Sequence, residues 1–193
     1  MHKTTYIKKE AGMKLFLRYT VVMIVATTLA GCASESSTTT SNSSPQAPDV
    51  ATVDGSVYLF DIEPEGAGNV IKVREEAGTN DELLVVGRIG GSSDPWIDGR
   101  AAFTIVDLSV KSCNDTLDDK CPTPWDYCCE TSKLPNSTAL VKFVDETDQV
   151  IRADARSLFG LQELSTVVIK GTAKRDEAGN LTVLASGLFV KQK

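Results

Sequence analysis

Short runs of alternating apolar and polar residues, separated by glycine and turn residues, fill roughly the last 110 positions of this 193-residue chain. Alternation with a period of two is typical of strands that bury one face. Asp154 is expected to cap a short helix at 155–159, which Gly160 ends. The predicted strands are residues 82–89, 101–106, 139–144 with an extension at 149–153, 166–174 and 181–190. The fold class is therefore mainly β.

Two strands, a third strand, a short helix and a closing hairpin follow the order of an OB-fold. Within the last hairpin, residues 168–171 and 179–185 resemble the fourth and fifth strands of such barrels. The resemblance implies a small five-stranded Greek-key barrel with one short helix between strands three and four. OB-folds bind ligands on an open face, so Trp96, Trp125 and Tyr127 are candidates for a ligand face. The alternative is that these aromatic side chains pack in the core or anchor loops, and we favour it.

Charge and histidine content exclude several classes of function. The chain has 20 Lys and Arg against 26 Asp and Glu, and its first 31 residues hold five of the former and one of the latter. The remainder has 15 basic and 25 acidic residues, a net charge of −10 that repels nucleic acid. The single histidine is His2. Without histidine after residue 31, we expect no Ser-His-Asp or Cys-His catalysis and no histidine-ligated metal or haem.

Residues 1–31 combine a basic start with an apolar run of about a dozen residues, shorter than the roughly 20 of a membrane-spanning helix. Together with Cys32, the last three of them form Leu29-Ala30-Gly31-Cys32, which resembles the lipobox of bacterial lipoproteins. That resemblance implies that residues 1–31 are a signal peptide and that Cys32 carries the lipid anchor. Ala33 implies sorting to the outer membrane, facing the periplasm. Either Met1 or Met13 can be the start, which leaves the mature chain unchanged.

The rest of the chain divides by composition. Residues 32–50 contain the lipidated cysteine and a Ser/Thr-rich flexible tether, which has too few apolar side chains to form a core. Residues 51–80 are an N-terminal extension, with an expected short strand at 55–61 and an expected helix at 69–77. Residues 81–193 form the barrel domain. A cysteine-rich loop at 111–136 interrupts it between the second and third strands.

Four cysteines lie within 17 residues of that loop: Cys113, Cys121, Cys128 and Cys129. An even number in an exported domain is typical of disulfides, and the favoured pairings tie Cys113 and Cys121 one each to Cys128 and Cys129. The alternative is a thiolate site for Zn²⁺ or Cu⁺, or a redox pair. The spacing matches neither a zinc ribbon nor a Cys-x-x-Cys motif. Both interpretations stay open.

The sequence therefore predicts a membrane-anchored envelope lipoprotein that is a non-catalytic binding or structural module. Its expected partners are the membrane, through the lipid, and an envelope protein or glycan, but not nucleic acid. No cofactor is expected unless the loop binds a metal. A metal-handling or thiol-redox protein is the alternative. Asp94, Asp98 and Asp107 lie near Trp96 in sequence, but nothing in the sequence sets their separation as a catalytic pair.

Overall fold

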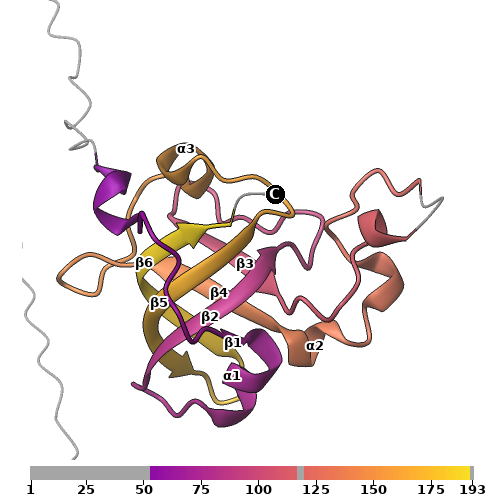
Figure 1. The fold of residues 1–193 in the computed structure, drawn as a ribbon, viewed down its shortest axis with the longest axis horizontal. Coiled ribbons are helices and arrows are strands. Elements are labelled where there is room, and N and C mark those ends of the chain that lie inside the picture. Colours follow the sequence, from indigo (N-terminus) through magenta and orange to yellow (C-terminus); the bar gives the residue numbers. More distant parts are fainter. Residues whose placement is uncertain (1–52, 117–119, 192–193) are drawn as a thin grey trace, which may run out of the picture. The chain divides into compact units, whose positions relative to one another are not determined.

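The computed structural model describes residues 53–116 and 120–191, all within the unit Pro48–Lys193. The strands are β1 (Gly68–Asn69), β2 (Glu82–Ile89), β3 (Ala102–Val106), β4 (Thr138–Phe143), β5 (Thr166–Arg175) and β6 (Leu181–Val190). They form one sheet in the order β1-β2-β3-β4-β6-β5, and β5 pairs back onto β2. This last pairing closes the five longer strands into a barrel (Figure 1).

The barrel is mixed: β4 and β6 are parallel, and its other strand pairs are antiparallel. In this order the first barrel strand pairs with the second and fourth, and the third pairs with the fifth, as in an OB-fold. A short helix, α3 (Ala155–Phe159), lies between the third and fourth barrel strands. The predicted mainly β fold, a small five-stranded OB-like barrel with that helix, is confirmed.

Alternating side chains of the strands fill the barrel. Every second residue of β4 is buried, and β6 follows the same alternation over its first half. Phe103, Val141, Phe143, Ile169 and Val183 have no exposed surface. The Phe143 ring contacts the rings of Tyr58, Phe103 and Phe159, which join β4 to three other parts of the chain. The barrel therefore has a continuous apolar core of its own.

Local signals predicted both ends of α3. The Asp154 side chain accepts a hydrogen bond from the Arg156 backbone N–H, which caps the start of the helix. Gly160 has φ 65° and ends it in the left-handed conformation. A further helix, α1 (Val70–Glu76), confirms the helix expected at 69–77, with Asn69 as its N-cap. Buried Asp107 also accepts from the Ile71 N–H at 2.8 Å, so a side chain from the end of β3 supports the same helix start.

The expected strand at 55–61 is wrong. Gly55–Tyr58 is a 3-10 helix, η1, and Leu59 makes only an isolated bridge to Leu188. Asp54 accepts from the Ser56 N–H and so stabilises the turn. Gly55 packs so closely on the chain that a Cβ there would lie 2.3 Å from the Leu158 oxygen. This close approach to α3, which local sequence does not reveal, replaces the strand.

The expected extension of the third strand at 149–153 is also wrong. Val150 forms only an isolated bridge with Val144. The Asp145 carboxylate accepts hydrogen bonds from Thr147 and Gln149, which bends the chain into a tight turn just after β4. After this turn the chain continues toward α3 instead of along the sheet.

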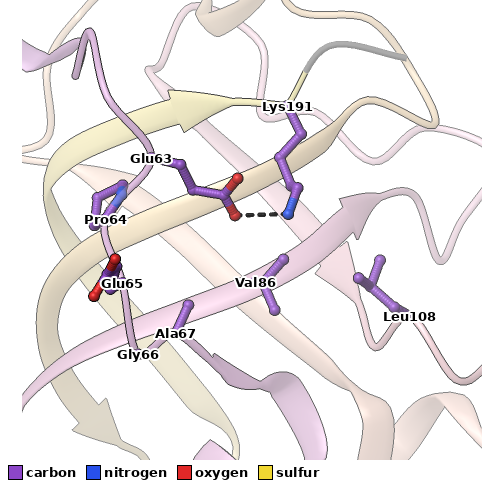
Figure 2. A pocket seen from close by; sticks show the side chains of 8 residues that line it. All are labelled: Glu63, Pro64, Glu65, Gly66, Ala67, Val86, Leu108 and Lys191. Carbon is purple, nitrogen blue, oxygen red and sulfur yellow. Dashed lines mark hydrogen bonds and ion pairs between the residues drawn. The ribbon is translucent and has the colours of Figure 1, made fainter.

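The segment from η1 to α1 runs across the barrel as a strap and ends in β1, which is parallel to β2. Glu63 in this strap pairs with Lys191 beyond β6 at 2.6 Å, beside Val86 and Leu108, in a shallow surface pocket (Figure 2). The expected signal peptide, Cys32 and the expected tether lie outside the described residues. Among those described, no helix is both long and apolar enough to cross a bilayer.

Candidate metal centre

The connection between β3 and β4, residues 107–137, holds all four loop cysteines; we call it the cysteine loop. It contains η2 (Cys113–Asp115), η3 (Cys128–Glu130) and α2 (Leu134–Ser137). The Asp107 N–H donates to the Ser137 oxygen at 2.8 Å and closes its base. The loop therefore returns to its starting point before β4 begins.

Tyr127 fixes the cysteine loop to the outside of the barrel. On β3, Ile105 belongs to the barrel core, whereas the next residue, Val106, packs in a separate apolar cluster. Neighbouring strand residues point to opposite faces, so Val106 lies on the outer face. Tyr127 packs there with Val106 and Val110 and is fully buried. The loop thus covers part of the outer face of β3, one of the strands that carry ligands in many OB-folds.

Polar contacts hold the same loop against β2 and the turn after it. Arg88 on β2 donates to the Asp115 carboxylate at 2.6 Å, and Ser112 also donates to it through its N–H and hydroxyl. Burial alone would raise the pKa of Asp115, but the hydrogen bonds from Ser112 and Arg88 lower it below its ordinary value. The Gly91 N–H donates to the Trp125 oxygen at 2.8 Å. Both halves of the loop are therefore anchored to the barrel.

Three sulfur atoms and one carboxylate meet within this loop. The Sγ atoms of Cys113, Cys121 and Cys128 and a carboxylate oxygen of Asp126 all lie within 4.8 Å of one another. The Cys113–Cys128 and Cys121–Cys128 sulfur distances are 3.4 and 3.8 Å, and the Cys113 sulfur is 3.9 Å from Asp126 Oδ1. Such a group of ligand atoms can hold a metal ion.

Backbone conformation places two of the four candidate ligands, Asp126 and Cys128, on either side of Tyr127. Tyr127 has φ 58° and ψ 36°, a left-handed conformation that is uncommon for a residue other than glycine. Because Tyr127 is buried under the loop, its neighbours Asp126 and Cys128 both turn toward Cys113. The Asp126 carboxylate accepts from the Cys128 N–H and from the Thr123 hydroxyl, each at 2.8 Å. These bonds set the orientation of the carboxylate before any ion arrives.

The protonation of the cluster follows from its surroundings. Burial raises the pKa of the Cys113 thiol, and hydrogen bonds with Cys113 and Cys121 raise the pKa of Cys128. Burial would also raise the pKa of Asp126, but hydrogen bonds from Thr123 and Cys128 lower it. Both shifts favour the protonated thiols of Cys113 and Cys128, and a bound cation would stabilise their thiolates.

The disulfides expected from the sequence are not formed in this structure. A disulfide bond is about 2.05 Å long, and the Cys113 and Cys128 sulfurs are 3.4 Å apart. Two sulfurs on one tetrahedral zinc, each about 2.3 Å from the ion, are about 3.8 Å apart. The observed separations of 3.4 and 3.8 Å are close to that value. The geometry fits shared ligation better than covalent pairing.

Cys129 stands outside the four-ligand group. Its sulfur lies 3.9 Å from that of Cys128, and both side chains are exposed, whereas Cys113 is buried. Cys129 therefore lies at the solvent edge of the cluster.

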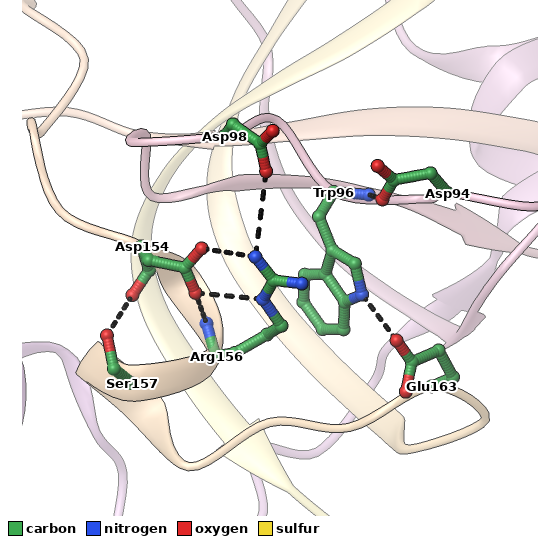
Figure 3. A network of polar contacts seen from close by, with 7 residues as sticks. All are labelled: Asp94, Trp96, Asp98, Asp154, Arg156, Ser157 and Glu163. Carbon is green, nitrogen blue, oxygen red and sulfur yellow. Dashed lines mark hydrogen bonds and ion pairs between the residues drawn. The ribbon is translucent and has the colours of Figure 1, made fainter.

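The three candidate aromatic residues do not make one ligand face. Trp96 is 5% exposed in the barrel core and donates from its indole to Glu163 at 2.7 Å, with the Arg156 guanidinium 5.6 Å from its ring centre (Figure 3). Tyr127 is buried under the cysteine loop. Trp125 is half-buried and donates to the Ser93 oxygen. These residues anchor loops and pack in the core, the alternative we favoured.

The three carboxylates near Trp96 in sequence have separate structural roles. Asp94 accepts from the Trp96 N–H, and exposed Asp98 pairs with Arg156 at 3.6 Å (Figure 3). Buried Asp107 accepts from Ile71 and Ser109. These contacts give each of the three carboxylates a local structural partner. The sequence did not single out Asp126 as a candidate ligand, although Asp126 lies only two residues before Cys128.

No protein-family model matches this chain, and no curated protein matches its sequence. The chemistry of the cysteine loop is therefore the basis for a proposed function.

Proposed function

We propose that this protein is a lipid-anchored binding module of the cell envelope whose cysteine loop is organised by a bound Zn²⁺ ion. The single observation that carries the metal assignment is the convergence of three sulfurs and one carboxylate oxygen within 4.8 Å. The lipobox ending at Cys32 supports the location, at the outer membrane and facing the periplasm. The metal assignment takes the place of the disulfide-stapled loop that the sequence favoured.

The donor set selects among metal ions. Three thiolates do not suit Ca²⁺ or Mg²⁺, which prefer oxygen ligands. Cu⁺ suits thiolates but has little preference for a carboxylate, so its natural site would use the three sulfurs alone. Zn²⁺ accepts both sulfur and carboxylate ligands in a tetrahedral arrangement. The hydrogen-bonded carboxylate of Asp126, directed to the cluster, favours zinc.

Four protein ligands would complete the coordination of zinc, which is the pattern of structural sites and not of catalytic ones. Such an ion would join Cys113 to the segment that carries Cys121, Asp126 and Cys128. It would thereby hold Tyr127 over the outer face of β3. We infer that the ordered cysteine loop, and not the covered strand face, is the surface that binds an envelope protein or a glycan.

The test measures zinc in the full-length chain, purified from membranes in detergent under anaerobic conditions. We expect about one zinc per chain, determined by elemental mass spectrometry together with protein concentration. C113S should lose most of the metal, because Cys113 is the buried ligand. C129S is the matched control and should keep it, because Cys129 lies outside the group. A chain that contains no zinc and takes none up after reduction would contradict the proposal.

The anchor needs its own measurement. In C32S the protein should no longer acquire a lipid, and its intact mass should lack the added acyl chains. It should also leave the membrane fraction. Zinc content should not change, because Cys32 lies outside the loop. An unmodified Cys32 in the mature native protein would contradict the proposed location and leave the metal assignment to be judged on its own measurement.

A further inference from the structure

A close sulfur pair in the cluster, Cys113 and Cys128, suggests a second chemical state of the same site. The Cys113 and Cys128 sulfurs are 3.4 Å apart, whereas Cys121–Cys128 and Cys128–Cys129 are 3.8 and 3.9 Å apart. We propose that a hydroperoxide oxidises Cys113 and Cys128 to a disulfide and releases the zinc, so that the cysteine loop is a peroxide-responsive switch. This inference rests on the zinc site proposed above.

Exposure sets the order of the two steps. The Cys128 side chain is exposed and Cys113 is 2% exposed, so a peroxide in solution reaches Cys128 first. The Cys128 thiolate attacks the peroxide O–O bond, forming a sulfenic acid and releasing hydroxide. The Cys113 thiolate then attacks that sulfur, forming the S–S bond and releasing a second hydroxide. Two electrons pass from the two sulfurs to the peroxide, and zinc leaves as the unchanged divalent ion.

Loss of these two thiolates removes half of the metal ligands. Cys121 and Asp126 would remain, and two protein ligands are too few for a stable zinc site. The new bond would replace the zinc as the link between η2 and η3, since Cys113 and Cys128 begin those two turns. Tyr127, next to Cys128, would stay buried. Oxidation would therefore free the Cys121 segment while keeping the rest of the loop in place.

The adjacent pair Cys128–Cys129 is one competing disulfide. Neighbouring cysteines close a small strained ring, whereas Cys113 and Cys128 are 15 residues apart in sequence and have no such restriction. The Cys113 and Cys128 sulfurs are also closer, at 3.4 Å, than the Cys128 and Cys129 sulfurs at 3.9 Å. The arrangement thus favours the bond between Cys113 and Cys128.

The experiment uses the zinc-loaded full chain in detergent, treated with hydrogen peroxide in the presence of a chromogenic zinc chelator. Trypsin cleaves after Lys111, Lys120 and Lys133, so Cys113 lies on a different peptide from the other three cysteines. We expect stoichiometric zinc release, a cross-link between the two peptides, and alkylation at Cys121 and Cys129. Thiol reductant and added zinc should restore the starting metal content.

Two variants separate the possible outcomes. C129S should release zinc and form the cross-link as the unaltered chain does, whereas C121S should bind zinc weakly and still form the cross-link. Retention of zinc under peroxide, or a disulfide within the single peptide from Cys121 to Lys133, would overturn the switch. A chain that holds no zinc before peroxide is added would instead overturn the proposed function, so the two failures are distinguishable.

Discussion

The barrel and the cysteine loop are stabilised by different interactions. In the barrel, paired strands surround a continuous core that includes Phe103, Phe143 and Ile169, all without exposed surface. The apolar cluster under the cysteine loop is small, with three buried residues and the partly buried Leu134. Apolar burial supplies most of the stability of a domain. The packing of its own core is therefore enough to stabilise the barrel, whereas the loop needs polar contacts and, as we propose, a metal ion.

The largest expected effect is on the barrel. Phe143→Ala removes a fully buried ring that contacts Tyr58, Phe103 and Phe159. We expect the free energy of unfolding to fall by about 3–5 kcal/mol, measured by chemical denaturation of the full chain. Ile62→Ala, at a side chain 82% exposed, is the control and should change it by less than about 0.5 kcal/mol. Similar effects at both positions would contradict the assigned core.

Removal of zinc should affect the loop and spare the barrel. After chelation, we expect backbone amides in residues 120–130 to lose hydrogen-exchange protection by about 100-fold or more, because a local structure held by few apolar contacts opens readily. Amides in β5 and β6 should keep their protection. Mass-spectrometric hydrogen exchange with and without chelator measures both regions at once. Equal loss in both would mean that the metal supports the whole domain.

An intermediate effect concerns α3, a short helix fixed by local contacts. Asp154→Ala removes the cap and the partner of Arg156, and should cost about 1 kcal/mol in the free energy of unfolding. Asp154→Asn should keep most of the cap, because its amide oxygen also accepts from the Arg156 N–H. Zinc content should be normal in both variants. A loss of metal from either would link α3 to the loop.

Asp154 should also make the free energy of unfolding depend on pH. The hydrogen bond from Arg156 lowers the pKa of Asp154 below its ordinary value. Because the folded-state pKa is the lower one, this carboxylate stabilises the fold above its unfolded pKa of about 3.9, and the contribution is lost as pH falls below that value. The free energies of unfolding of the native chain and of D154N, measured by denaturation between pH 3 and 6, should converge at the acid end. A difference that grew toward low pH would contradict this sign.

Prediction from sequence succeeded where structure depends on near neighbours. The bounds of β2, β6 and α3 followed from alternation, turn residues, and the cap residues Asp154 and Gly160. The strand expected at 55–61 failed because the conformation there depends on Gly55 packing against Leu158, about a hundred residues away in sequence. Its strand-like local pattern gives no sign of that contact.

The candidate site shows the same limit. The four cysteines stood out by their number and spacing, but Asp126 did not stand out among the other acidic residues of the loop. Asp126 joins the cluster beside Tyr127, which adopts a left-handed conformation and packs against Val106 on β3. The sequence singled out the cysteines, with disulfides favoured over a metal site, and only the packing of the loop on the barrel shows which carboxylate lies among their sulfurs.

The smallest expected effect is that of removing the Tyr127 hydroxyl, and it shows whether packing or polar contacts hold Tyr127 in the loop. The buried Tyr127 hydroxyl has no hydrogen-bond partner among the described residues, and burial raises its pKa to about 12. A buried hydroxyl without a partner contributes nothing favourable, so Tyr127→Phe should change the free energy of unfolding by no more than about 0.5 kcal/mol and leave zinc content unchanged. Tyr58→Phe is the matched comparison, because the Tyr58 hydroxyl donates to the Val144 oxygen at 3.3 Å, and it should cost about 0.5–1 kcal/mol. If Tyr127→Phe proves the more costly change, the hydroxyl has a polar partner in solution, and the loop depends on polar contacts even at its apolar anchor.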